Sequence, residues 1–231
     1  MHIARCRLTL HDTLFYATRE MGTLYETERY IHNYALSYAL FNDSIIRVPY
    51  FCASYKPNYA GDLGKLNEAG IYVTPARPLI WDYVLATWKM AQVTYYRKPE
   101  RFGGKNYPVN IGRAKELGPG STFEFFVLSQ KPVSLPRWIR LGKWMSKAEV
   151  ANLSTQISKV HSADKPFIAA CPLNPLDIPS QASAFDLISM PPVSLINNAR
   201  LIGAYYEVSG VRLPAGMKYT FPEEYCEASI L

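Results

Sequence analysis

The chain has 231 residues, of which 48% are hydrophobic and 19% are charged, a composition typical of a folded globular protein and not of a disordered one. Its formal net charge of +6 favours an anionic partner such as a nucleic acid. Charged residues near the start argue against a signal peptide, and no apolar run reaches the ~18 residues of a membrane span, so we expect a cytoplasmic protein without membrane contact.

The first part of the chain predicts a strand, a helix and a long connection. Residues 4–10 alternate apolar and polar side chains, which is the period of a half-buried strand. Residues 17–26 predict a loop, and Thr27 predicts the N-cap of a helix whose tyrosine-rich stripe ends at residues 42–44. Residues 47–70 contain prolines, glycines and tyrosines without periodicity, and we expect them to form a long connection.

A glycine-rich, basic segment follows between predicted strands. Residues 71–74 and 79–96 are rich in β-branched and aromatic types, and residues 122–128 resume that pattern. Residues 97–121 have no hydrophobic period and contain Gly-Gly and Gly-Pro-Gly sequences. We therefore expect a long hairpin with a flexible tip, a thumb-like insertion at residues 97–121.

The last third of the chain predicts short strands around one more helix. Residues 137–141 predict a strand, and the S-x-x-E sequence at residues 146–149 predicts a capping box that opens a helix. Residues 160–200 are a Pro-rich elaboration, and residues 200–208 and 217–221 predict late strands. The order of elements fits a single α+β domain over residues 1–231, with either a ferredoxin-like (split βαβ) core carrying insertions or another α+β sandwich.

Enzyme and metal signatures are missing from the sequence. It contains no phosphate-binding loop, nucleophile elbow or zinc-protease motif. The four cysteines are widely scattered without a C-x-x-C pair, so we expect reduced thiols, no metal site and no cofactor. His32, beside tyrosines on the first predicted helix, is either hydrogen-bonded at the helix surface or a general acid/base for metal-free RNA cleavage.

The positive charge is concentrated in residues 97–147. This window has eleven basic residues against three glutamates, whereas the rest of the chain has 14 basic and 16 acidic residues. Gly142 and Lys143 lie between the predicted strand and the predicted helix N-terminus, where free N–H groups favour a phosphate. Residues 137–147 therefore predict a fixed strand–turn–helix phosphate seat. Aromatic residues among the cations can stack on unpaired bases. The predicted RNA-binding residues are Arg97, Lys98, Arg101, Lys105, Tyr107, Arg113, Lys115, Arg137, Trp138, Arg140, Gly142, Lys143, Trp144 and Lys147.

Four blocks of sequence resemble one protein family in the same order. They are L-T-L-H-D-T-L-F-Y-A-T-R-E-M-G-T-L-Y-E-T-E-R-Y-I-H-N-Y-A-L at residues 8–36, N-Y-P-V-N-I-G-R-A-K-E-L at 106–117, S-T-F-E-F-F-V-L-S at 121–129 and P-R-W-I-R-L-G-K-W-M-S-K-A at 136–148. The family is the Csc-one family, the Cas-five-type subunit of type I-D CRISPR effector complexes. The likeness runs through most of residues 1–150 and is weaker at residues 160–200.

The resemblance implies a ferredoxin-like, RNA-recognition-motif-like core with a thumb, for which residues 97–121 are the candidate. It implies a non-catalytic subunit at the foot of a Cascade-type assembly that holds the 5′ handle of the CRISPR RNA. The implied partners are the large Cas-ten-type subunit and the first Cas-seven-type backbone subunit, with target DNA near the foot and a separate Cas-six-type enzyme processing the guide.

Two other functions stay open at this point. One branch of the Cas-five superfamily cleaves guide precursors with tyrosine, lysine and histidine side chains, and this sequence offers Tyr34 and His32 but places no lysine beside them. The other is a protein-binding scaffold whose basic window meets acidic partner surfaces.

Overall fold

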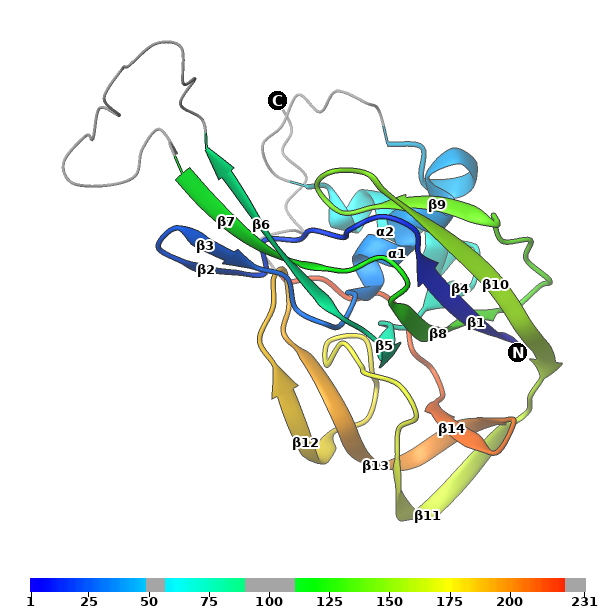
Figure 1. Ribbon diagram of the computed structural model, residues 1–231. Helices are drawn as coiled ribbons and strands as arrows, with labels where there is room; N and C mark the ends of the chain where they lie inside the picture. The colour runs from blue at the N-terminus through cyan, green and yellow to red at the C-terminus, as the bar shows by residue number, and fades with distance from the viewer. Residues whose placement is uncertain (49–56, 90–110, 223–231) are drawn as a thin grey trace, which may run out of the picture.

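A six-stranded sheet forms the centre of the structure, a computed structural model that describes residues 1–48, 57–89 and 111–222 (Figure 1). Its strand order is β4-β8-β1-β10-β9, with β5 paired to β8, and all of these neighbours are antiparallel. The strands are β1 (His2–Leu10), β4 (Ile71–Val73), β5 (Arg77–Ile80), β8 (Thr122–Ser129), β9 (Trp138–Leu141) and β10 (Ser146–Ile157). The strands predicted at residues 4–10, 71–74, 122–128 and 137–141 are therefore confirmed.

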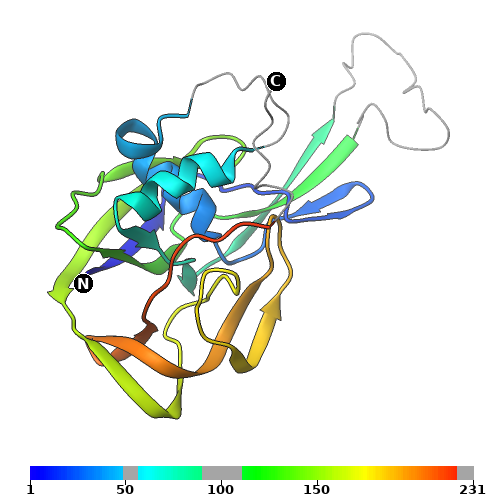
Figure 2. The ribbon, with the colours of Figure 1, turned by 180° about the vertical axis from the view of Figure 1, so that it is seen from behind.

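Two helices cover one face of this sheet (Figure 2). They are α1 (Asn33–Phe41), which continues into the π-helical turn η1 (Asn42–Ile46), and α2 (Tyr59–Glu68). The N-cap of α1 is His32 and not Thr27, whose hydroxyl instead bonds to the backbone of Tyr16. The connection predicted over residues 47–70 contains α2, and its residues 49–56 lie outside the described structure. The longer of the two helices, α2, has ten residues. In the described ranges, no helix is long and apolar enough to cross a membrane.

The segment predicted as a helix from residue 146 is strand β10. Ser146, Ala148 and Val150 are buried, and the residues between them point away from the core, so the burial has the period of two. The capping box does not form, since the Ser146 hydroxyl donates to the Thr13 carbonyl and Glu149 pairs with Arg137. Pairing along the whole of β1 stabilises the strand more than the local cap would stabilise a helix.

A second sheet projects from the centre and has the order β2-β3-β7-β6 (Figure 1). Its strands are β2 (Arg19–Met21), β3 (Leu24–Glu26), β6 (Tyr83–Lys89) and β7 (Ile111–Leu117). The loop predicted at residues 17–26 is thus a tight hairpin around Gly22, whose φ is +66°. The run predicted as one strand over residues 79–96 begins as two strands, β5 and β6. The described strands of the hairpin are β6 and β7, whereas β8 belongs to the central sheet, and residues 90–110 lie outside the described structure.

The Pro-rich elaboration forms a third sheet with the order β11-β13-β12 and β14 paired to β13. Its strands are β11 (Val160–Ile168), β12 (Ala182–Ile188), β13 (Leu195–Val208) and β14 (Val211–Pro214). The strand predicted at residues 200–208 is part of β13, whereas residues 217–221 form no strand. The whole is a mixed α/β structure, mostly strands with few helices.

The segment after β14 packs against the helices through a buried polar cluster. The hydroxyl of Tyr219 lies 2.6 Å from Ser37 Oγ. The carboxylate of Asp177 accepts from Asn33 Nδ2 at 2.8 Å, from the Tyr72 hydroxyl at 2.9 Å and from the backbone N–H of Thr220 at 2.9 Å. Burial raises the pKa of Asp177 to about 7. This cluster ties the end of the described chain to α1 and β4.

Candidate nucleic-acid interface

The edge hairpin formed by β9 and β10 presents one polar face and one apolar face. Ile139 and Leu141 point into the core, whereas Trp138 and Arg140 alternate with them and are exposed. Arg140 pairs with Lys147 across the hairpin, and Trp138 pairs with Glu149. The alternation of a strand therefore brings two cations and an indole together on one surface.

Trp138 is the centre of a cluster of charged side chains. Lys147 Nζ lies 4.1 Å from the centroid of its ring, and Arg137 Cζ lies at 5.7 Å. The ring of His11 meets the indole edge-on at 5.0 Å. Glu149 accepts from Arg137 Nε at 2.9 Å, and Arg137 and His11 hold the pKa of this carboxyl below its usual value. Trp138 is 42% exposed, and the cations lie at the face of its ring.

The turn at Gly142 and Lys143 lacks the helix N-terminus and the free backbone N–H groups of the predicted phosphate seat. No helix follows it, and both backbone donors are used within the fold. The Gly142 N–H donates to the Tyr16 hydroxyl at 3.0 Å, and the Lys143 N–H donates to the Phe15 carbonyl at 3.0 Å. Gly142 has φ +75°, and a Cβ there would lie 2.7 Å from Leu14 Cδ1 and from the Phe15 carbonyl oxygen. The prediction of a helix-terminal anion site is therefore wrong, and the exposed Lys143 side chain remains as the cation of this turn.

An aromatic chain joins this turn to the projecting hairpin. Trp144, 52% exposed, stacks on Phe15 with ring centroids 4.4 Å apart. Its other neighbour is Trp88 of β6, edge-on at 6.2 Å, and Trp88 in turn stacks on Tyr25 of β3 at 5.8 Å. Sequence reasoning named Trp144 alone, because the other rings come from distant parts of the chain.

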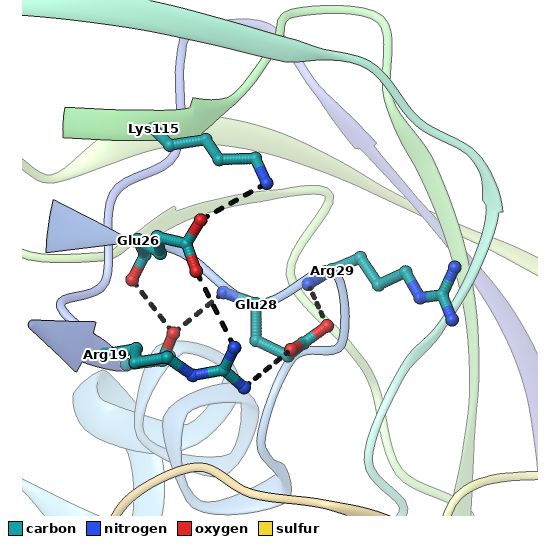
Figure 3. A network of polar contacts seen from close by, with 6 residues as sticks. Arg19, Glu26, Glu28, Arg29 and Lys115 are labelled. Carbon is teal, nitrogen blue, oxygen red and sulfur yellow. Dashed lines mark hydrogen bonds and ion pairs between the residues drawn. The ribbon is translucent and has the colours of Figure 1, made fainter. Parts of the chain in front are cut away.

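The cations of β7 have different surroundings. Arg113 is exposed, whereas Lys115 Nζ lies 3.5 Å from a carboxylate oxygen of Glu26 and 4.4 Å from the ring centroid of Tyr83. Figure 3 shows that Lys115 and Arg19 converge on Glu26, and Arg19 also reaches Glu28 at 3.9 Å. Lys115 is therefore partly neutralised. The predicted contacts Arg97, Lys98, Arg101, Lys105 and Tyr107 lie outside the described residues.

A groove of about 850 Å³ separates the β9–β10 hairpin from α1 and η1. Trp138, Arg140 and Lys147 line one side, and Tyr38 and Asn42 line the other. The Arg140 guanidinium donates to the Met145 carbonyl at 3.1 Å and stays exposed. Of the predicted binding residues in 137–147, those that line this groove are Trp138, Arg140, Gly142 and Lys147, whereas Arg137, Lys143 and Trp144 lie outside its lining.

His32 is a buried N-cap and not a surface residue. It is 4% exposed, its Nδ1 accepts from the Tyr34 N–H at 3.2 Å, and its Nε2 donates to the Val193 carbonyl at 3.1 Å. Burial lowers its pKa to about 4, although the bond to Val193 opposes this shift. The ring lines a cavity of about 330 Å³ together with Tyr34 and Lys143, a lysine that the sequence did not place there.

No metal-ligand cluster was found in the part of the chain that the structure describes. No three His, Cys, Asp or Glu side chains gather there as metal ligands would. The described thiols, Cys6 and Cys171, are free and buried, and burial raises the pKa of each to about 12.

The sequence matches a family model over almost the whole chain. The family model described as "Type I-D CRISPR-associated protein Cas5/Csc1" matches residues 1–222. No curated protein matches the sequence. One solved chain, from a structure titled "Cryo-EM structure of the Type III-B Cmr-beta bound to cognate target RNA and AMPPnP, state 1", has a TM-score of 0.42 and 10% sequence identity, over 86% of this chain and 86% of that chain.

Proposed function

Because this chain belongs to the type I-D Cas5/Csc1 family of CRISPR-associated proteins, we propose that it is a non-catalytic effector-complex subunit that holds the 5′ handle of the CRISPR RNA. One observation carries the proposal, the exposed cation and indole surface of the β9–β10 hairpin beside its groove. We call this surface the hairpin grip and define it by Trp138, Arg140, Lys143, Trp144 and Lys147.

The hairpin grip suits an unpaired RNA strand better than a duplex. Its two exposed indoles can each stack on a base, which stabilises a complex by about 1–3 kcal/mol per base. Its lysines and arginine can contact phosphates, which adds affinity that falls as salt rises. Stacking needs splayed bases, and such bases occur in single-stranded ends and loops.

The proposal includes the position of this subunit within the CRISPR effector complex. The subunit caps the foot of a cytoplasmic complex and contacts a Cas-seven-type backbone subunit and a large Cas-ten-type subunit, close to target DNA. Exposed apolar side chains on β5 and β6 support contacts with protein partners, since Ile80 is 69% exposed and Leu85 60% exposed.

The central sheet also supports a ferredoxin-like origin of the fold. A ferredoxin-like domain has the order strand, helix, two strands, helix, strand. Here β1, α1, β4, β8 and β10 follow that order, and the second helix is replaced by the short edge strand β9. We propose that this replacement created the hairpin grip.

The non-catalytic role rests on the state of His32. An imidazole with a pKa of about 4 is neutral at physiological pH, and both of its nitrogens are engaged within the fold. The second candidate function is metal-independent RNA cleavage, favoured by the cavity that His32 shares with Tyr34 and Lys143. Incubation of the purified chain with repeat RNA in EDTA separates the two, and we expect intact RNA. Site-specific cuts that disappear with His32→Ala would establish the nuclease instead.

Binding of repeat-handle RNA tests the main proposal directly. The double variant Lys143→Gln/Lys147→Gln should weaken binding about tenfold or more, since charged hydrogen bonds stabilise by about 1.5–3 kcal/mol each. It should also reduce the slope of log K against log salt by about 1.4, or 0.7 for each lost phosphate contact. Lys159→Gln removes an exposed lysine outside the hairpin grip and should change neither quantity. Unchanged affinity and slope in the double variant would exclude the hairpin grip as the RNA site.

A further inference from the structure

A second basic groove lies apart from the hairpin grip. It has a volume of about 790 Å³ and is bounded by the connection at Arg29 and Tyr30, by β5 with the following Trp81, and by β11, β13 and β14 of the third sheet. None of the residues that define the hairpin grip lines this groove.

Arg29 is held in the groove by aromatic rings. Its Cζ lies 5.2 Å from the ring centroid of Trp81 and 5.5 Å from that of Tyr30. Figure 3 shows its guanidinium directed away from the carboxylates of Glu26 and Glu28. No carboxylate pairs with this guanidinium among the described residues. Stacked rings fix a guanidinium while leaving its N–H edge available for a bidentate oxygen ligand.

Arg212 repeats this arrangement on the opposite element, β14. Its Cζ lies 4.9 Å from the ring centroid of Tyr205 on β13, and the residue is exposed. Glu207 of β13 faces Arg212 across the ladder, but among the described residues no ion pair joins Arg212 to this or another carboxylate. Two guanidiniums that lie over aromatic rings thus reach the same groove, one from the connection between β3 and α1 and one from β14 of the third sheet.

The remaining charges leave the groove cationic. Arg77 also lines it, but its Nε donates to Glu124 at 2.9 Å, and this same carboxylate accepts from Arg5 Nε at 2.6 Å. Among the described lining residues, Glu207 is the one acidic side chain. The lining therefore has three arginines, of which Arg77 is paired with Glu124, and one carboxylate, and this excess of positive charge favours an anionic ligand.

We propose that this groove binds a second single-stranded phosphodiester segment, of RNA or DNA, through phosphates at Arg29 and Arg212 and a base at Trp81. Trp81 is 39% exposed and offers a stacking face beside a phosphate-binding guanidinium. A peptide of Glu and Asp could use the guanidiniums but has no aromatic ring to stack on the indole, so the combination of guanidiniums and indole favours a nucleic acid. The inference does not depend on the hairpin grip being the site of the RNA handle.

Photo-cross-linking of the full chain tests the groove separately from the hairpin grip. The probes are a 4-thiouridine RNA 12-mer and a 5-bromodeoxyuridine DNA 12-mer, and adducts are located by peptide mass spectrometry. We expect an adduct at Trp81 with at least one probe, and the probe that gives the stronger adduct identifies the nucleic acid. Adducts confined to Trp138 and Trp144 with both probes would overturn the groove and leave the hairpin grip intact.

Variants of the two guanidiniums complete the test. Arg29→Gln/Arg212→Gln should reduce the Trp81 adduct about tenfold or more, because two charge-assisted contacts are lost. The Lys143→Gln/Lys147→Gln variant should leave this adduct in place. Arg200→Gln, which removes an exposed arginine of β13 outside the groove, is the matched control and should also retain it. An unchanged adduct in the arginine double variant, or tighter binding of a labelled Glu/Asp decapeptide than of either oligonucleotide, would overturn the proposal.

Discussion

The buried carboxylate of Glu124 offers a quantitative test of how the central sheet is stabilised. Glu124 is 2% exposed in the middle of β8, where it accepts from Arg5 of β1 and from Arg77 of β5. The substitution Glu124→Gln keeps the shape of the side chain but removes its charge. Two guanidiniums then face one neutral amide.

The expected loss follows from the burial of the three groups. Removal of one partner of a fully buried ion pair costs about 3–5 kcal/mol. The side chains of Arg5 and Arg77 are 31% and 38% exposed, so water partly solvates them after the substitution. We therefore expect a smaller loss of unfolding free energy, about 2–3 kcal/mol. For a chain of this length that corresponds to a Tm lower by about 5–10 °C.

Thermal unfolding monitored by circular dichroism measures this loss at neutral pH. The matched control is Glu149→Gln, which neutralises a half-buried carboxylate paired with Arg137, a side chain that is 74% exposed. We expect no measurable shift in Tm for the control, because solvent screens this pair. Equal shifts for the two variants, or an unchanged Tm for Glu124→Gln, would refute the reasoning that the buried carboxylate holds β1 and β5 to β8.

Three further changes test local features. Gly142→Ala should lower the unfolding free energy by about 2–3 kcal/mol, because a positive φ and a clash with the backbone coincide at this residue. Gly120→Ala should lower it by only about 1–2 kcal/mol, because Gly120 has φ +82° but open space around it. Urea unfolding of the two variants measures this difference. The low pKa of His32, about 4, means that its unfolded form binds more protons below pH 6.5, so the contribution of His32 to stability should rise from pH 4 to 6.5; this rise is measured as the difference in unfolding free energy between the wild type and His32→Gln. The raised pKa of Asp177, about 7, means that its native form binds more protons, so the contribution of Asp177 should fall from pH 4 to 7 and oppose that of His32; urea titrations of the wild type and Asp177→Asn across the range measure this fall as their difference.

Local pattern was sufficient for four strands of the central sheet, β1, β4, β8 and β9. Residues 4–10 and 122–128 have the alternation or the β-branched and aromatic content that a pleated, half-buried surface selects. The same reasoning failed at β10, because the S-x-x-E sequence at residues 146–149 is a local signal and the pairing of β10 with β1 is not. It also missed α2, whose Gly61 and Gly64 are poor helix formers and whose helix is stabilised by burial of Leu63 and Leu66.

The candidate site was predictable in composition but not in arrangement. The cations and indoles of residues 137–147 stand out in the sequence, and the structure places them on one hairpin. Trp144 stacks on Phe15 and meets Trp88 edge-on, and these contacts join three separate segments that no spacing rule connects. Nor does the sequence reveal that the N–H of Lys143 is occupied by the Phe15 carbonyl, a bond that replaces the predicted anion seat.

The central position of β1 has a consequence for biosynthesis. Among the described strands it leaves the ribosome first, yet its two neighbours, β8 and β10, begin at residues 122 and 146. Both edges of β1 therefore stay unpaired until the residues of the helices and of the second sheet have been synthesised. Such long-range pairing is slow and leaves strand edges open to other chains. Arg5 and Arg7 place charge on the waiting strand, which discourages edge-to-edge association until β8 brings the carboxylate of Glu124.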